Sequence, residues 1–88
     1  MARFYLSHPV ENFDKWKPLF DAHEGDRKGA GLSDLGVYRK VGNENNLIIV
    51  LEGAPDGMKK MIESPELMET MKEAGVLATP EVFSGEKL

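Results

Sequence analysis

The sequence contains no cysteine, which excludes disulfides, thiolate zinc sites and iron–sulfur clusters. It also lacks a basic cluster, because its 11 Lys and Arg residues stand against 15 Asp and Glu residues for a net charge of −4. Binding to nucleic acid requires concentrated positive charge, so we expect no nucleic-acid partner. The longest apolar run, residues 47–51, is far too short to cross a bilayer, and the first residues lack the features of a signal peptide. A cytoplasmic protein without a membrane partner is therefore the expectation.

The 88 residues are enough for one domain, which we place over residues 1–88. A chain near this size buries only about 60% of its unfolded surface, so its core gives marginal stability. Short natural domains compensate with disulfides, metals or a second subunit. Because disulfides are excluded, we expect a homodimer.

Hydrophobic alternation and turn residues predict strands and helices in the order β-α-β-β-α-α-β. This order predicts an α+β fold with a ferredoxin-like antiparallel sheet, and right-handed crossovers place the helices on one face. Asn12 is expected to cap a helix that runs to about residue 28 with a bend at Pro18. Ser64 is expected to cap the last helix, whose buried side would carry Leu67, Met68 and Met71. The predicted strands are residues 3–8, 35–41, 47–51 and 80–83, with a turn at 42–46.

The third predicted strand is apolar at every position, Leu47-Ile48-Ile49-Val50-Leu51. A strand with one face in water would alternate, so this strand is expected to be covered on both faces. The helices of one chain can cover one face only. A second subunit is the simplest cover for the other.

Four residues form an inward stripe on the first predicted helix: Trp16, Phe20, His23 and Arg27. At about 100° per residue they fall within about 60° of one another. Two aromatic rings therefore share a face with an imidazole and a guanidinium, which is typical of the wall of a ligand pocket. The stripe alone does not define a reaction.

Each candidate residue has a functional and a structural interpretation. His23 is a candidate general base, helped by His8 at the end of the first strand, or else a histidine that binds a backbone carbonyl. Arg27 is a candidate to hold a carboxylate or enolate, or else it pairs with an acidic group of the partner subunit or extends to solvent. Trp16 and Phe20 offer an apolar wall for an aromatic ligand, or else simple core packing.

Tyr38 is a candidate hydrogen-bond donor to a substrate oxygen. It lies on the opposite face of its strand from Arg39, so at most one of the two reaches a given cavity. The two histidines have no metal-binding spacing to each other, and we expect no metal site.

Several segments resemble the small dimeric α+β barrel proteins grouped with antibiotic-biosynthesis monooxygenases and polyketide cyclases. They are His8-Pro9-Val10, Phe13-Asp14-Lys15-Trp16-Lys17-Pro18, Phe20-Asp21 with His23, Ser64-Pro65-Glu66-Leu67, Ala74-Gly75-Val76 and Pro80-Glu81-Val82. The resemblance implies a dimer in which two sheets close a barrel, with a small cavity in each subunit. It also implies that His8, Trp16 and His23 match recurrent positions.

The sequence lacks the Asn-Trp-His set of the haem-degrading members, so haem breakdown is not expected, and no cofactor is expected. Two functions remain open. One is an enzyme of the cofactor-free monooxygenase or cyclase type, acting on an aromatic or polyketide-like molecule. The other is a non-catalytic dimeric binding or accessory domain, because fold alone does not decide function.

Overall fold

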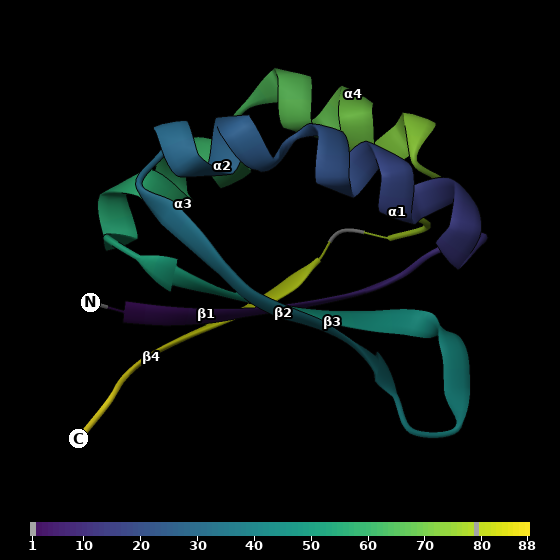
Figure 1. The fold of residues 1–88 in the computed structure, drawn as a ribbon, viewed down its shortest axis with the longest axis horizontal. Helices are drawn as coiled ribbons and strands as arrows, with labels where there is room; N and C mark the ends of the chain where they lie inside the picture. Colours follow the sequence, from purple (N-terminus) through teal and green to yellow (C-terminus); the bar gives the residue numbers. More distant parts are fainter. Residues whose placement is uncertain (1, 79) are drawn as a thin grey trace.

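The computed structural model of this protein describes residues 2–78 and 80–88. Within them the strands are β1 (Ala2–Pro9), β2 (Leu32–Lys40), β3 (Asn43–Gly53) and β4 (Glu81–Glu86). They form an antiparallel sheet in the order β2-β3-β1-β4. The helices are α1 (Phe13–Ala22), α2 (Glu24–Gly29), α3 (Pro55–Ile62) and α4 (Pro65–Glu73). All of these helices lie on one face of the sheet (Figure 1). The predicted ferredoxin-like α+β fold is therefore confirmed, and its order of elements differs only in that two helices, α1 and α2, stand where one was predicted.

The predicted helix caps are present. The Oδ1 atom of Asn12 accepts the backbone N–H groups of Asp14 at 2.8 Å and Lys15 at 3.3 Å. The Oγ atom of Ser64 accepts the N–H of Leu67 at 3.4 Å, and a proline occupies the first turn of α4. These side chains satisfy amides that have no partner inside the helix, so the two starts are set by local sequence.

The predicted continuous helix to residue 28 is wrong, because the chain breaks at His23 between α1 and α2. Pro18 lies inside α1. At the break, the backbone N–H of His23 bonds to the Phe20 carbonyl at 3.2 Å, one residue short of helical spacing. The His23 side chain bonds to the Leu19 carbonyl at 2.8 Å. The His23 side chain thus satisfies a carbonyl group that has no partner at the end of α1, and this contact stabilises the break in the helix. Helical periodicity in the sequence does not reveal such a contact.

The strands are longer than predicted. β2 begins at residue 32 rather than 35, β3 covers 43–53 rather than 47–51, and β4 covers 81–86 rather than 80–83. The polar residues assigned to a turn open β3, and the connection narrows to Val41 and Gly42, where Gly42 has φ +83°. Pairing with neighbouring strands holds these polar residues in extended conformation despite their low strand propensity.

The two faces of the sheet have different environments. Cross-strand pairs on the helical side build the core: Phe4 with Leu51, Leu6 with Ile49 and His8 with Leu47. Ile48 and Val50 point to the other side of β3, as the alternation of a strand requires. No helix covers that side in Figure 1. The part of the chain that the structure describes therefore covers one face of the apolar strand and leaves the other open.

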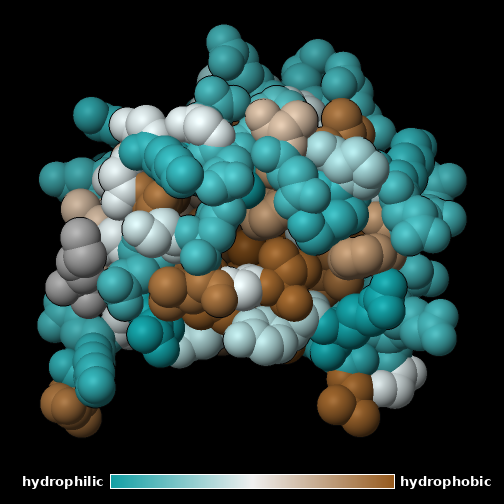
Figure 2. All heavy atoms as spheres, viewed as in Figure 1, coloured by the Kyte–Doolittle hydropathy of each residue, from teal (hydrophilic) through white to brown (hydrophobic). Residues whose placement is uncertain are grey.

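No residue of α4 is fully buried. Met68, predicted to be buried, is 55% exposed, whereas Leu67 and Met71 are half-buried. The prediction for Met68 is wrong because α4 packs on the rest of the protein along a narrow side that includes Leu67 and Met71. Met68 lies outside that side. Figure 2 shows hydrophilic residues over the helical layer and a band of apolar residues below it.

Across residues 2–78 and 80–88, no helix has the length and hydrophobicity needed to cross a membrane.

Candidate functional site

A cavity of about 380 Å³ lies between the sheet and the helices. Its sheet side consists of Leu6, His8, Ile49 and Leu51. Trp16, Phe20, His23 and Arg27 line it from α1, α2 and the residue between them. Side chains of α3 and α4 line the opposite side. The predicted inward stripe is thus brought together with His8 around a single cavity, even though the helix that carries the stripe is broken.

Planar groups stack along the helical wall of the cavity. The rings of Trp16 and Phe20 are stacked with centroids 4.7 Å apart and an interplanar angle of 22°. The guanidinium carbon of Arg27 lies 3.7 Å from the centroid of the Phe20 ring. The imidazole of His8 meets Trp16 edge-on, with centroids 5.8 Å apart. Stacking of this kind favours flat apolar ligands, because aromatic pairs gain energy beyond the area they bury.

His8 is a buried titratable group without a hydrogen-bond partner at one of its nitrogens. Its residue is 4% exposed, and its Nδ1 atom is unpaired within the described residues. Burial lowers the pKa of His8 below its ordinary value, and the Pro9 backbone opposes this only in part. His8 is therefore uncharged near neutral pH. A buried polar atom left without a partner costs stability.

The lowered pKa of His8 predicts a pH-dependent stability. Below the ordinary value of 6.5, the unfolded chain takes up a proton that native His8 does not, so the free energy of unfolding falls as the pH falls. The loss amounts to about 1.4 kcal/mol for each unit by which the native pKa is lowered. Urea unfolding at about pH 7.5 and about pH 5.5 measures it, with His8→Leu as the comparison. The stability of the wild type relative to the variant should decrease in acid. A difference that does not change with pH would contradict a neutral, buried His8.

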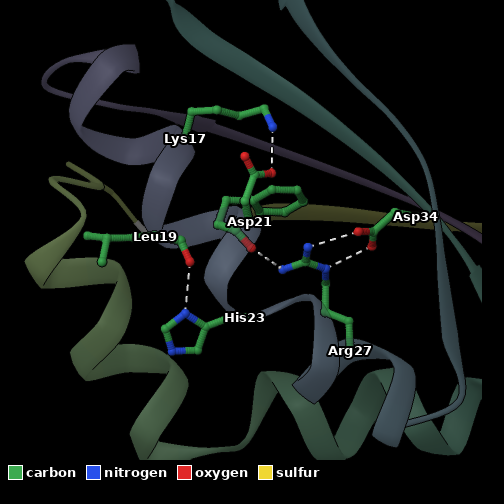
Figure 3. Close-up of polar contacts among 7 residues, drawn as sticks. Lys17, Leu19, Asp21, His23, Arg27 and Asp34 are labelled. Carbon is green, nitrogen blue, oxygen red and sulfur yellow. Dashed lines mark hydrogen bonds and ion pairs between the residues drawn. The ribbon is translucent and has the colours of Figure 1, made fainter.

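His23 is held in one orientation by the backbone of α1. Its Nδ1 lies 2.8 Å from the Leu19 carbonyl oxygen (Figure 3). A carbonyl only accepts, so Nδ1 carries the proton, and the Nε2 of the neutral ring keeps its lone pair. A half-buried histidine oriented in this way is suited to accept a proton at Nε2. The backbone contact and a role toward a ligand are therefore compatible.

Arg27 has its pairing group within the same chain. Its Nε and Nη2 atoms each donate to a carboxylate oxygen of Asp34 at 2.8 Å, and Nη1 donates to the Phe20 carbonyl at 2.9 Å (Figure 3). The side chain of Arg27 is 7% exposed and that of Asp34 is 29% exposed. The bidentate pair fixes the guanidinium against Phe20 and neutralises its charge. The structure therefore pairs Arg27 with an acid of its own subunit, whereas the sequence interpretation had placed that acid in the partner subunit.

Tyr38 is not brought together with the other five candidates. It is 57% exposed and pairs with Ile48, which places it on the open face of the sheet. Arg39 is the member of the pair that faces the helices, with its guanidinium carbon 4.4 Å from the Phe13 ring centroid. The two side chains lie on opposite faces of β2 as expected, and neither of them lines the cavity.

Sequence reasoning did not assign several residues that build the site. Asp34 lay before the predicted start of its strand, and a register shift between Asp34 and Gly36 changes the face on which each residue lies. Leu67 and Met71 were assigned to the core but line the cavity, together with Met61. Their helical spacing indicated burial correctly, and nothing in it distinguishes a filled core from a cavity wall. Among residues 2–78 and 80–88, no group of three or more His, Asp or Glu side chains is placed to hold a metal ion.

Comparison with known proteins places the fold. No protein-family model matches the sequence, and no curated protein matches it. Among solved structures, a Bordetella bronchiseptica protein provisionally assigned as an antibiotic biosynthesis monooxygenase superposes with a TM-score of 0.77 at 15% identity, over 99% of this chain and 96% of that one. A conserved protein from Methanosarcina mazei gives 0.72 at 18% identity, over 99% and 92%. Another structure, described as an antibiotic biosynthesis monooxygenase, gives 0.68 at 11% identity, over 100% and 99%. The resemblance inferred from the sequence is therefore confirmed for the fold: this chain has the fold of the antibiotic biosynthesis monooxygenase-like proteins.

Proposed function

We propose that the cavity binds a small aromatic or polyketide-like molecule and that His23, helped by His8, moves a proton on it, as a cofactor-free monooxygenase- or cyclase-like enzyme requires. The observation that carries the proposal is that His8 and His23 line one cavity whose wall is formed by stacked aromatic rings. A ligand hydroxyl would donate a hydrogen bond to the Nε2 lone pair of His23. The names of the structurally similar proteins agree with this reaction class.

The size of the cavity supports a ligand of one or two rings. Its volume of about 380 Å³ falls in the range of about 300–1,000 Å³ that ligand sites occupy. Leu6, Ile49 and Leu51 give it an apolar floor, and Trp16 and Phe20 give it a flat wall. Most of the binding free energy would come from burial of the ligand's apolar surface, and His8 would fix its orientation.

The chemistry of the two histidines supports proton transfer. The Nε2 of His23 carries a lone pair, because Nδ1 donates to the Leu19 carbonyl. Burial keeps His8 neutral, so it adds no charge of its own to the cavity. A neutral imidazole near physiological pH is a suitable general base for a carbon acid next to a carbonyl group.

Two probes test binding and proton transfer separately. The chain has one tryptophan, so its indole N–H gives one cross-peak in a nitrogen–proton NMR spectrum. Titration with 2-naphthol should shift this peak saturably in the wild type and in the exposed-site control Met68→Ala. With 2-tetralone in heavy water, the wild type should accelerate exchange of the protons next to the ketone, and His23→Ala should lose most of that acceleration.

A second function, a binding domain without catalysis, is favoured by the state of Arg27. Its contacts with Asp34 and the Phe20 carbonyl leave no unpaired cation on the aromatic wall to stabilise an oxyanion. Saturable binding of 2-naphthol with no accelerated exchange of 2-tetralone would support this function. Failure of both probes to shift the Trp16 indole signal would contradict ligand binding in either form.

We also propose that a second copy of the chain covers the open face of the sheet. Tyr5, Tyr38 and Phe83 are large exposed side chains on this face, and they surround Ile48 and Val50. A contiguous apolar surface of this kind is typical of an interface. The same face of two copies can meet around a twofold axis, which gives a closed dimer without exposing a further apolar surface.

A further inference from the structure

Among residues 2–78 and 80–88, no uncompensated charge lies in the buried part of the cavity. Arg27 is the buried cation of its wall, and both oxygens of Asp34 bind it at 2.8 Å. His8 is neutral because burial lowers its pKa. The other charged lining residues, Asp26, Lys60 and Glu66, are exposed at the surface, where water screens them. A ligand that reaches the aromatic wall therefore meets dipoles and rings rather than an available ion.

An anionic ligand would lose more than it gains in this cavity. Its carboxylate would give up hydration on entering, and that loss is repaid only by a well-placed cation. Arg27 is such a cation, but Asp34 already binds it through two parallel charge-assisted hydrogen bonds. Because Asp34 belongs to the same chain, this pairing costs no translational freedom, whereas the binding of a free carboxylate does. A ligand carboxylate beside Arg27 would also be repelled by Asp34.

We infer that the cavity selects uncharged aromatic ligands that carry a hydroxyl or ketone, and that Asp34 enforces this selection by neutralising Arg27. This inference rests on the proposed binding function. Asp34 acts as a specificity-determining residue through Arg27 and does not line the cavity itself. The hydroxyl matches the lone pair on Nε2 of His23, and a ketone acidifies the neighbouring proton that this nitrogen would accept.

A matched pair of probes tests the selection in the unaltered protein. The two probes, 2-naphthol and 2-naphthoate, share a ring system and differ in charge near neutral pH. From the shift of the Trp16 indole signal, we expect 2-naphthol to bind about tenfold or more tightly than 2-naphthoate. Equal or tighter binding of 2-naphthoate would overturn the inference and leave ligand binding established. Binding of neither probe would overturn the proposed function instead.

Asp34→Asn tests the cause of the selection. The amide keeps the shape of the side chain and an acceptor for one Arg27 N–H, but it removes the negative charge. We expect the affinity for 2-naphthoate to rise about tenfold while the affinity for 2-naphthol changes little. Glu24→Gln is the control, because Glu24 is exposed, pairs with Lys28 at 3.1 Å and loses the same charge outside the cavity. Equal gains in the two variants would assign the effect to net charge and contradict the role of Asp34. The wild-type comparison decides the selection itself even where Asp34→Asn does not fold.

Discussion

Replacing Ile48 by aspartate is expected to convert a dimer into a folded monomer. Ile48 lies on the open face of β3, between Ser7 of β1 and Tyr38 of β2. An aspartate there remains in water in the monomer, but the dimer would bury its charge without a partner. The dissociation constant should rise roughly a hundredfold or more, which corresponds to about 3 kcal/mol.

Sedimentation equilibrium or light scattering measures this change as a fall from twice the 9.8 kDa chain mass to that mass. Met68→Asp is the matched control, since it adds the same charge to an exposed apolar residue on the helical side of the molecule. It should remain a dimer. A wild type that is already monomeric at micromolar concentration, or an Ile48→Asp variant that stays dimeric, would contradict the proposed interface.

Replacing Trp16 by alanine is expected to remove a large part of the stability of the subunit. The tryptophan is 3% exposed and packs against Phe20, Phe13 and His8. Truncation of a buried tryptophan costs about 3–5 kcal/mol, because the side chain's burial is lost and a cavity remains. Domains have only about 5–15 kcal/mol in total, so the variant should unfold at much lower urea concentration.

Urea unfolding followed by circular dichroism measures this loss without relying on tryptophan fluorescence. Trp16→Phe should retain much of the stability, because a phenyl ring still stacks on Phe20. Met68→Ala should lie within about 0.5 kcal/mol of the wild type, since its side chain is exposed. A Trp16→Ala variant as stable as Met68→Ala would show that the aromatic stack is not a structural element of the subunit.

The fold was predictable from the sequence because its signals are local. Asn12 and Ser64 mark the starts of helices through their own side chains, and the alternation of Phe4, Leu6 and His8 sets the buried face of β1. The extent of the strands was less predictable. The polar start of β3 is extended because β2 and the end of β1 pair with it, a non-local effect that local propensity does not contain.

The candidate site was predictable in its aromatic wall and less so in its polar contacts. Helical spacing brought Trp16, Phe20, His23 and Arg27 to one side, and the break at His23 did not move them out of the cavity. The partner of Arg27 could not be found in this way. Asp34 binds Arg27 from β2, where a register shift between Asp34 and Gly36 changes the face on which each residue lies. The two histidines share a cavity because β1 and the end of α1 meet in the tertiary fold, which spacing along the chain does not show.

The most direct test of the account is the position of bound 2-naphthol, measured by intermolecular nuclear Overhauser effects. We expect contacts from the naphthol ring protons to the Trp16 indole and to the methyl groups of Ile49 and Met71, which line one cavity. The competing location is the open face of the sheet, where exposed aromatic side chains also offer stacking surfaces. Contacts to Tyr38 and Phe83, with none to Trp16, would show that the ligand binds outside the cavity and would contradict the account.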